Sequence, residues 1–389
     1  MKFLPFALPE ISDDEISEVV DSLRSGWLTT GPKTKRFESD FSAFVGTDCE
    51  SIAVNSATAG LHLVLEALGI GPGDEVITTP YTFTATAEII RYLGADPVFV
   101  DIEIPTYNIN VSDIEAAISP KTKALMIAHT LGNPFNLELI MEISKKYNLW
   151  VIEDDCDSLG ATYKGRKTGT FGDLATLSFY PAHHITMGEG GAVFMNNPEL
   201  KAIAESFRDW GRDCYCPPGC DNTCGCRFEQ KHGDLPYGYD HKYVYSHSGY
   251  NLKITDMQAA CGLAQLGKLE YFIEKRRSNY AYLRNKLESL KDFIHLPIPT
   301  PNSNPSWFGF PITVKENPII QNILISGIKK DELKELLLDK MTLKKKESKA
   351  SNTRKPSHNE VKWLSIFLNL RLIPSIYNTL ACKDLLLVC

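Results

Sequence analysis

The chain has 389 residues, of which 41 are Lys or Arg and 48 are Asp or Glu, so its formal net charge is −7. An apolar content of 43% and a charged content of 23% are ordinary for a soluble globular protein. The acidic balance argues against a protein that coats nucleic acid, because such domains are usually basic. No stretch reaches the ~18 uninterrupted apolar residues that a membrane span needs. The length predicts two or three domains.

The first predicted element is a helix that begins after Ser12. Ser12 and Glu15 have the spacing of a capping box, and Gly26 would end the helix. Four apolar residues would share its buried face: Ile16, Val19, Val20 and Leu23. The opening residues contain two prolines and four acidic residues, which is not typical of a signal peptide. We therefore expect an N-terminal helical arm over residues 1–25 of a cytoplasmic protein whose cysteines stay reduced.

Short apolar runs alternate with helical runs between residues 51 and 195, which predicts βαβ units around a mostly parallel sheet. Ligands of such sheets bind at the carboxyl ends of the strands. Chemistry is therefore expected at the residues that follow these runs: Asn55, Ser56, Asp154, Asp155, Cys156, Asp157 and Ser178.

The later part of the chain is less regular. An irregular insert rich in Cys, Gly and Tyr interrupts the domain, and long helices follow from Ile254 to Leu290. We expect a large cofactor-binding α/β domain over residues 26–265 with the insert at 212–247. A small C-terminal domain would cover 266–389 and become irregular or divergent after about residue 316. The basic stretch from Lys344 to Ser357 and the apolar tail fit either true divergence or an out-of-frame translation.

Several motifs together resemble the DegT/DnrJ/EryC1/StrS sugar aminotransferases. They are EDDCDSLGATYKGRKTGTFGDLATLSFYPAHHITMGEGGAVF at residues 153–194, with NSATAGLHLVLEALGIGPGDEVITTPYTFTATA upstream and GYNLKITDMQAACGLAQL downstream. The resemblance covers roughly residues 3–316. It implies a pyridoxal phosphate-dependent enzyme of fold type I, like aspartate aminotransferase, with a large mixed or parallel sheet and a small C-terminal domain.

The resemblance also implies the coenzyme contacts. Asp154 would lie against the pyridine nitrogen and keep it protonated, so that the ring accepts electrons. The backbone N–H groups of Ala57 and Thr58, at a helix start, and the hydroxyl of Ser178 would bind the phosphate. Phe83 would stack on the ring. Asn251 would reach the phosphate of a neighbouring subunit, which implies a homodimer.

His183 stands where the family has the lysine that anchors the coenzyme, and no lysine occurs between Lys167 and Lys201. An imidazole cannot form that covalent link, so the resemblance implies noncovalent pyridoxamine 5'-phosphate (PMP). His183 would act as the base, since imidazole transfers protons readily near neutral pH. Asp157 and Tyr180 are expected in the same pocket, and His184 is read as structural.

Five of the ten cysteines lie between Cys214 and Cys226. Their spacing alone permits zinc or an iron–sulfur cluster about equally. Within the family, the spacing Cys156-x57-Cys214-x-Cys216-x7-Cys224 implies ligands of a [2Fe–2S] cluster. Cys220 and Cys226 would then be spare thiols.

These features together imply a member that removes the C3 hydroxyl of CDP-4-keto-6-deoxy-D-glucose, in 3,6-dideoxyhexose and O-antigen biosynthesis. An NADH-dependent reductase that carries FAD and [2Fe–2S] would supply the electrons. Two alternatives stay open, namely a cluster-free nucleotide-sugar 3-dehydratase and an inactive remnant with a disrupted C-terminal domain. The missing lysine disfavours a plain transaminase.

Overall fold

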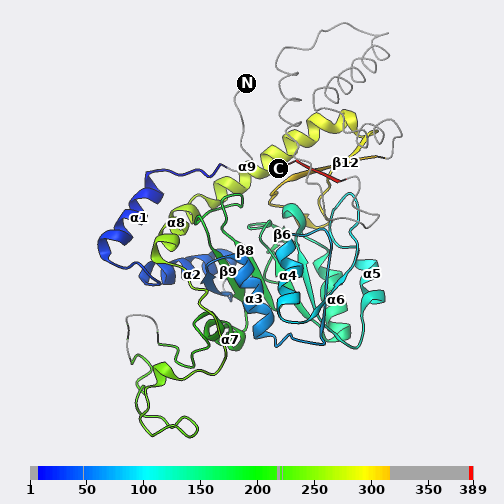
Figure 1. Ribbon diagram of the computed structural model, residues 1–389. Coiled ribbons are helices and arrows are strands. Elements are labelled where there is room, and N and C mark those ends of the chain that lie inside the picture. The colour runs from blue at the N-terminus through cyan, green and yellow to red at the C-terminus, as the bar shows by residue number, and fades with distance from the viewer. Residues whose placement is uncertain (1–7, 47, 217–219, 221, 316–384, 389) are drawn as a thin grey trace, which may run out of the picture. The chain divides into compact units, whose positions relative to one another are not determined.

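The computed structural model describes residues 8–46, 48–216, 220, 222–315 and 385–388 (Figure 1). The chain forms two compact units. The sheet unit comprises Ala7–Ala281 and Ile298–Phe308. The tail unit comprises the remaining residues, and its described part is 282–297, 309–315 and 385–388. The predicted basic stretch and most of the apolar tail lie outside the described residues.

A seven-stranded sheet in the order β1-β9-β8-β5-β4-β2-β3 forms the centre of the sheet unit. Only β9 runs against its neighbours, because it pairs antiparallel with both β1 and β8 while the remaining pairs are parallel. The strands are β1 (Glu50–Val54), β2 (Glu75–Thr78), β3 (Asp96–Phe99), β4 (Thr122–Ala128), β5 (Trp150–Asp154), β8 (Leu174–Ser178) and β9 (Gly191–Met195). The predicted α/β class with a mixed or parallel sheet is confirmed.

Helices cover both faces of this sheet. Alternate strand residues enter different cores, since Ile52 packs with α3, α4 and α7 whereas Ala53 packs with α2 and α8. A third core lies around α5 and α6. The helices are α2 (Pro32–Val45), α3 (Ala57–Ala67), α4 (Thr84–Tyr92), α5 (Val111–Ala117), α6 (Leu137–Tyr147), α7 (Pro198–Arg208) and α8 (Asp256–Leu266), with the 3-10 turns η1 (Thr130–Gly132) and η2 (His241–Tyr243).

The first helix, α1 (Asp13–Ser25), has the predicted capping box at Ser12. Its predicted buried face is wrong in part, because Ile16 and Leu23 are exposed. Glu15 and Ser22 are buried instead as α1 packs on α8. Glu15 lies 2.7 Å from Lys268. Burial would raise the pKa of Glu15, but bonds from Lys268 and Ser12 outweigh it and lower the value to about 2.

Smaller elements complete both units. In the sheet unit, β6 (Thr162–Tyr163), β7 (Arg166–Lys167) and β11 (Ser303–Asn304) form a three-stranded sheet. In the tail unit, β10 (Ile294–His295), β12 (Phe310–Val314) and β13 (Leu385–Val388) form another, and η3 (Glu288–Leu290) precedes it. The long helix α9 (Leu269–Leu287) contributes to both units. None of the described helices is long and apolar enough to cross a bilayer.

Candidate active site

The carboxyl ends of neighbouring strands bring the predicted residues to one edge of the sheet. Ser178, at the end of β8, is opposite Gly191 of β9, and Gly191 is opposite Val54 at the end of β1. On its other side β8 pairs with β5, which ends at Asp154. The start of α3, the hydroxyl of Ser178 and the carboxylate of Asp154 therefore lie along the same edge, where ligands of open α/β sheets bind.

Asp154 is a buried carboxylate, only 5% exposed. Its Oδ2 accepts a hydrogen bond from Thr86 Oγ1 at 3.0 Å, and its Oδ1 accepts one from the Cys156 N–H at 3.3 Å. Burial raises the pKa of Asp154, and the nearby charge of Asp157 adds to that rise. Within the described residues no cationic side chain pairs with Asp154. A buried carboxylate in this state suits a protonated ring nitrogen, whose charge would stabilise its ionised form.

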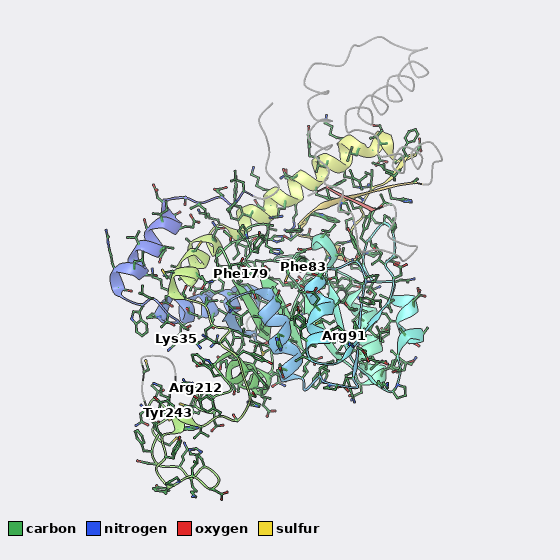
Figure 2. The ribbon with its side chains drawn as sticks, viewed as in Figure 1. Lys35, Phe83, Arg91, Phe179, Arg212 and Tyr243 are labelled. Carbon is green, nitrogen blue, oxygen red and sulfur yellow. The ribbon has the colours of Figure 1, made fainter. Side chains whose placement is uncertain are left out.

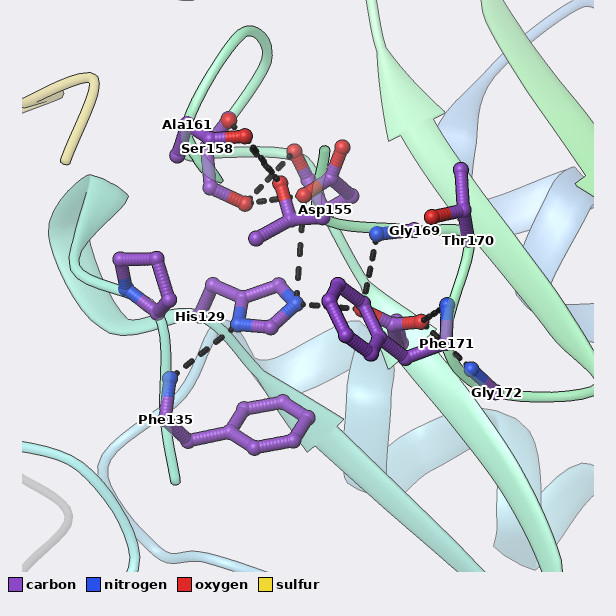
Figure 3. Close-up of polar contacts among 12 residues, drawn as sticks. His129, Phe135, Asp155, Ser158, Ala161, Gly169, Thr170, Phe171 and Gly172 are labelled. Carbon is purple, nitrogen blue, oxygen red and sulfur yellow. Dashed lines mark hydrogen bonds and ion pairs between the residues drawn. The ribbon is translucent and has the colours of Figure 1, made fainter. Parts of the chain in front are cut away.

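His129 and Glu153 form a buried pair at the end of β5, next to Asp154. Figure 3 shows His129 with Phe135 and Asp155 around it. His129 Nε2 lies 2.9 Å from Glu153 Oε2, and His129 Nδ1 accepts the N–H of Phe135 at 3.2 Å. Since a backbone N–H can only donate, Nδ1 carries no proton. His129 is therefore neutral and donates through Nε2.

Glu153 accepts three more hydrogen bonds from backbone N–H groups. Those of Phe171 and Gly172 reach Oε1 at 2.8 and 2.7 Å, and that of Gly169 reaches Oε2 at 2.7 Å. Burial would raise the pKa of Glu153, but the bond from His129 and the N–H groups of Gly172 and Gly169 outweigh it and lower the value. The sequence analysis missed this hydrogen-bonded His129–Glu153 pair. The only signal was an acidic residue inside an otherwise apolar strand.

Asp155 follows on the same loop and is 2% exposed. It accepts a hydrogen bond from the Ser158 hydroxyl, and its Oδ1 lies 4.0 Å from His129 Nε2. Burial raises the pKa of Asp155 to about 7, although the hydrogen bond from Ser158 opposes the rise. Asp155 thus points toward the His129–Glu153 pair. The sequence analysis did not distinguish it from its neighbours.

The start of α3 offers an opening for an anion. Ser56 caps the helix by accepting the Ala59 N–H at 3.1 Å, which leaves the N–H groups of Ala57 and Thr58 in the first turn without helical partners. A Cβ atom at Gly191 would lie 2.7 Å from Ala57 N, so only glycine permits this close approach. Ser178 Oγ accepts the Tyr180 N–H at 3.2 Å, and its own proton stays available to a ligand.

His183 lies on the loop after β8, with Nδ1 3.5 Å from Asp157 Oδ1. Its ring packs against Phe308, with centroids 5.1 Å apart, and its carbonyl accepts a bond from Arg276 at 3.0 Å. Nδ1 is buried without a hydrogen bond. The adjacent His184 is 3% exposed and bonds Ser306, and burial, with help from Arg276, lowers its pKa well below the ordinary value. His183 is thus the histidine of this pair that faces the strand ends.

Two aromatic side chains at this edge are open to solvent. Phe83, the residue before α4, is 76% exposed, and Tyr180 is 51% exposed. Asn251 is also exposed, and its Oδ1 accepts a bond from Lys253 at 2.9 Å. Side chains predicted to contact the coenzyme are therefore not covered by the described part of the chain.

The predicted cluster ligands do not assemble within one chain. Cys156 is half-buried, and desolvation followed by the charge of Asp154 raises its pKa well above the ordinary value. The thiols of the insert contact one another instead. Cys216 interacts with Cys214 and Cys224, and Cys224 interacts with Cys226. Among the described residues, no three His, Cys, Asp or Glu side chains are placed to hold a metal ion. A single chain in this conformation therefore does not fit the cluster. Cys226 was expected to be a spare thiol, but it lies against Cys224.

The described part of the insert is nevertheless held in shape. His241 Nε2 lies 2.6 Å from Asp213 Oδ2, and Arg227 binds Asp240 through two bonds of 2.7 and 2.8 Å. A bond of 3.0 Å from the Asp213 N–H to the Val244 carbonyl joins the two ends of the insert. The thiols thus sit on a folded lobe.

A hollow elsewhere in the sheet unit carries none of the predicted residues. It is lined by the starts of β4 and β5, including Thr122 and Trp150, together with Tyr147. Because β4 and β5 are parallel, this hollow lies at the amino ends of the strands, opposite the candidate site.

The fold is type I of the pyridoxal phosphate-dependent enzymes, as in the solved structures that it resembles. It has a mixed seven-stranded sheet, an acidic residue at the end of β5 and a helix start at the same edge. The predicted fold class is thereby confirmed. The chain belongs to the DegT/DnrJ/EryC1/StrS aminotransferase family, which it matches over residues 9–353. The predicted family is confirmed as well.

Individual relatives are similar over most of this chain. The lipopolysaccharide biosynthesis protein RfbH of Salmonella typhimurium is 55% identical over 335 residues, which are 84% of this chain and 75% of RfbH. The dTDP-4-dehydro-2,6-dideoxy-D-glucose 3-dehydratase of Saccharopolyspora spinosa is 49% identical over 312 residues, 78% of this chain and 67% of the relative. The solved structure of E. coli GDP-4-keto-6-deoxy-D-mannose-3-dehydratase with bound hydrated PLP is 28% identical, with a TM-score of 0.73 and 85% of each chain covered.

Proposed function

We propose that the chain is a nucleotide-sugar 3-dehydratase that uses PMP to remove the C3 hydroxyl of a 4-keto-6-deoxyhexose. The observation that carries this proposal is His183. It occupies the position of the family's anchoring lysine and lies 3.5 Å from Asp157 beside the coenzyme edge. Two of the relatives described above are themselves named 3-dehydratases, which supports the same reaction class.

The coenzyme, when bound, supplies an amine that condenses with the C4 ketone and a ring that accepts electrons. Asp154 holds the ring nitrogen in its protonated form, and Phe83 covers one face of the ring. The N–H groups of Ala57 and Thr58 and the hydroxyl of Ser178 bind the phosphate. Asn251 of the partner subunit adds a further contact to the phosphate. These residues bind and orient the reacting groups.

His183 moves the proton. It would take a proton from the methylene carbon beside the coenzyme's amine and would give a proton to the departing C3 hydroxyl, so that water leaves. Asp157 faces Nδ1 and favours the tautomer that carries its proton there, so that Nε2 is the basic nitrogen. Tyr180 is exposed at the coenzyme edge, where it orients the ring hydroxyl and the substrate.

Substitution of His183 tests this proposal. His183→Asn keeps a polar side chain of similar reach but has no basic nitrogen, so dehydration should fall by roughly 10²–10⁴-fold. Binding of PMP, followed by its absorbance, should persist. A His183→Lys variant is the matched control, because it should capture pyridoxal phosphate covalently in a borohydride-reducible form and still fail to dehydrate. Normal turnover by His183→Asn would exclude His183 as the base.

A finer proposal gives the chain the activity of a CDP-4-keto-6-deoxyglucose-3-dehydrase. It adds a CDP-linked substrate, a [2Fe–2S] cluster on Cys156, Cys214, Cys216 and Cys224, and an NADH-dependent reductase. The cysteine spacing supports the cluster, and similarity to a lipopolysaccharide biosynthesis protein supports the pathway. Dehydration rates with CDP-, dTDP- and GDP-linked 4-keto-6-deoxy sugars test the carrier.

A cluster-free 3-dehydratase is the second candidate, because no metal-holding group is assembled within the described residues. Iron and acid-labile sulfide analysis of anaerobically purified protein separates the two candidates. Two irons and two sulfides per chain would support the cluster, and their absence together with intact dehydration would support the second candidate.

A further inference from the structure

The loop that carries His183 is anchored at its base. It begins at Phe179, the residue after β8, which Figure 2 labels. The Met187 N–H donates to the Phe179 carbonyl at 2.9 Å, which joins the two ends of the loop. The Phe179 ring is fully buried and packs edge-on against Phe37, with centroids 5.3 Å apart. These contacts fix the loop at the end of β8, but none of them involves His183 itself.

The imidazole of His183 is not oriented by a hydrogen bond to Asp157. Nδ1 lies 3.5 Å from Asp157 Oδ1, which is beyond the roughly 2.7–3.2 Å of a normal N–H···O bond. Among the described residues Nδ1 has no hydrogen-bond partner. The imidazole instead packs on the ring of Phe308, with 5.1 Å between the centroids. Its orientation therefore depends on where the chain holds Phe308.

Arg276 of α9 connects His183 with Phe308. Its Nη2 donates to the His183 carbonyl at 3.0 Å. Its Nη1 donates to the carbonyls of Trp307 and Phe308 at 3.2 and 3.3 Å. These residues all belong to the sheet unit. Because the two nitrogens of one planar guanidinium are used, a single side chain fixes the backbone of the base and the backbone of its ring partner.

The segment around Phe308 is held from another side as well. The N–H groups of Ser306 and Phe308 donate to main-chain carbonyls of η1 at 3.1 and 2.9 Å. Gly132 in that turn has a φ of 89°, and a Cβ atom there would lie 2.8 Å from Phe308 N, so the turn requires glycine. The segment is thus a fixed support, and Arg276 ties His183 to it.

We propose that Arg276 is a positioning residue for the reaction, which holds His183 against Phe308 so that the base meets the coenzyme edge in one orientation. The inference rests on the proposed function and goes beyond it by naming the group that orients the base. Arg276 acts through His183 and needs no contact with the coenzyme or the sugar. A lysine would keep the charge, but its single nitrogen cannot replace the two nitrogens that span these carbonyls.

Arg277, the next residue of α9, offers a matched control. Like Arg276 it is half-buried and donates to main-chain carbonyls, those of Pro305 at 3.0 Å and Gly160 at 3.1 Å. Neither of these acceptors belongs to the loop of His183. Substitution of either arginine therefore removes a similar set of hydrogen bonds, whereas only substitution of Arg276 releases the base.

The first experiment compares Arg276→Met and Arg276→Lys with Arg277→Met. The substrate is whichever CDP-, dTDP- or GDP-linked 4-keto-6-deoxy sugar the wild type dehydrates fastest. Both Arg276 variants should keep PMP binding and the KM for the sugar, while kcat falls by roughly 10–10²-fold, because a misplaced base slows the chemical step. Arg277→Met should keep its kcat and lose as much stability to urea as Arg276→Met. An unchanged kcat in both Arg276 variants, or an equal fall in Arg277→Met, would overturn the inference.

A double variant asks whether Arg276 acts through His183. Arg276→Met is combined with His183→Asn, and the residual dehydration rate is compared with that of His183→Asn alone. Since a positioning effect needs the imidazole, the two rates should be equal. A further fall by the factor that Arg276→Met causes in the wild type would show that Arg276 acts by another route.

The orientation of His183 can also be followed without coenzyme or sugar. In protein labelled with carbon-13 at the histidine Cε1 atoms, the NMR signal of His183 is the one that His183→Asn lacks. This signal should shift or broaden in Arg276→Met and Arg276→Lys and stay in place in Arg277→Met. An unmoved signal in both Arg276 variants would contradict the positioning role.

Failure of the proposed function gives a different pattern. No dehydration by the wild type, or normal turnover by His183→Asn, contradicts the proposed function itself, and the NMR signal still tests the link between Arg276 and His183. Dehydration that depends on His183 but not on Arg276 contradicts this inference alone.

Discussion

The coenzyme edge and the insert are built in opposite ways. Asp154 and Ser178 lie at the ends of paired strands and are buried, and the first turn of α3 begins soon after β1. The thiols of the insert are held by a few side-chain pairs on a lobe with an exposed aromatic surface. The difference indicates that strand pairing organises the coenzyme edge, whereas side-chain pairs hold the insert.

Among the variants that test this comparison, Asp154→Asn should have the largest effect on activity. The amide cannot stabilise a protonated ring nitrogen, so dehydration should fall by roughly 10²–10³-fold, while iron content should not change. The turnover rate and the coenzyme spectrum measure the effect. Asp173→Asn removes a carboxylate at the other end of the same strand pair, where it accepts the Val151 N–H at 2.8 Å, and should leave activity nearly unchanged. Equal losses in both variants would contradict the role of Asp154.

Glu153→Gln should show that the His129–Glu153 pair stabilises the fold at the coenzyme edge. The variant loses the charge that accepts bonds from His129 and three backbone N–H groups, so the free energy of unfolding should fall by about 2–3 kcal/mol. Urea denaturation measures the change. Arg227→Met breaks the corresponding pair in the insert and should cost about 1 kcal/mol or less, because that pair is partly exposed. A larger loss from Arg227→Met would reverse the comparison.

Alkylation should distinguish the two sets of thiols in metal-free protein. Hydrogen bonds from Thr223, and then from Cys224 and Cys214, lower the pKa of Cys216 to about 6, whereas burial raises that of Cys156. At pH 7, Cys216 should react with iodoacetamide at least about tenfold faster than Cys156. Its rate should fall as the pH drops below 6, because the thiolate becomes protonated. Peptide mapping by mass spectrometry measures both rates, and equal rates would contradict the opposite pKa shifts of the two thiols.

Local sequence signals predicted the sheet and the position of its chemistry well. The alternation of short apolar runs with helices predicted the strands that end at Val54, Asp154 and Ser178, because each strand is buried and leads into a polar loop. The face of α1 was predicted poorly. Its apolar spacing favoured Ile16 and Leu23, but the capping residue Glu15 is drawn inward by Lys268.

Contacts between distant residues were beyond sequence reasoning. His129 and Glu153 are 24 positions apart, and neither belongs to a motif with a recognised spacing. The contacts among the thiols of the insert were equally hidden, since the spacing of the cysteines does not specify which thiols lie against one another.

The contact between Gly191 and Ala57 has a consequence for how the enzyme can change. The width of the anion opening is set by main-chain atoms of a reversed strand and a helix start, so no rotamer of a neighbouring side chain can adjust it. Displacement of β9 would shift both Ser178, its partner across the ladder, and the amides of α3. Variation in this scaffold is therefore expected in exposed side chains such as Tyr180, and not in the main-chain frame formed by β9 and the start of α3.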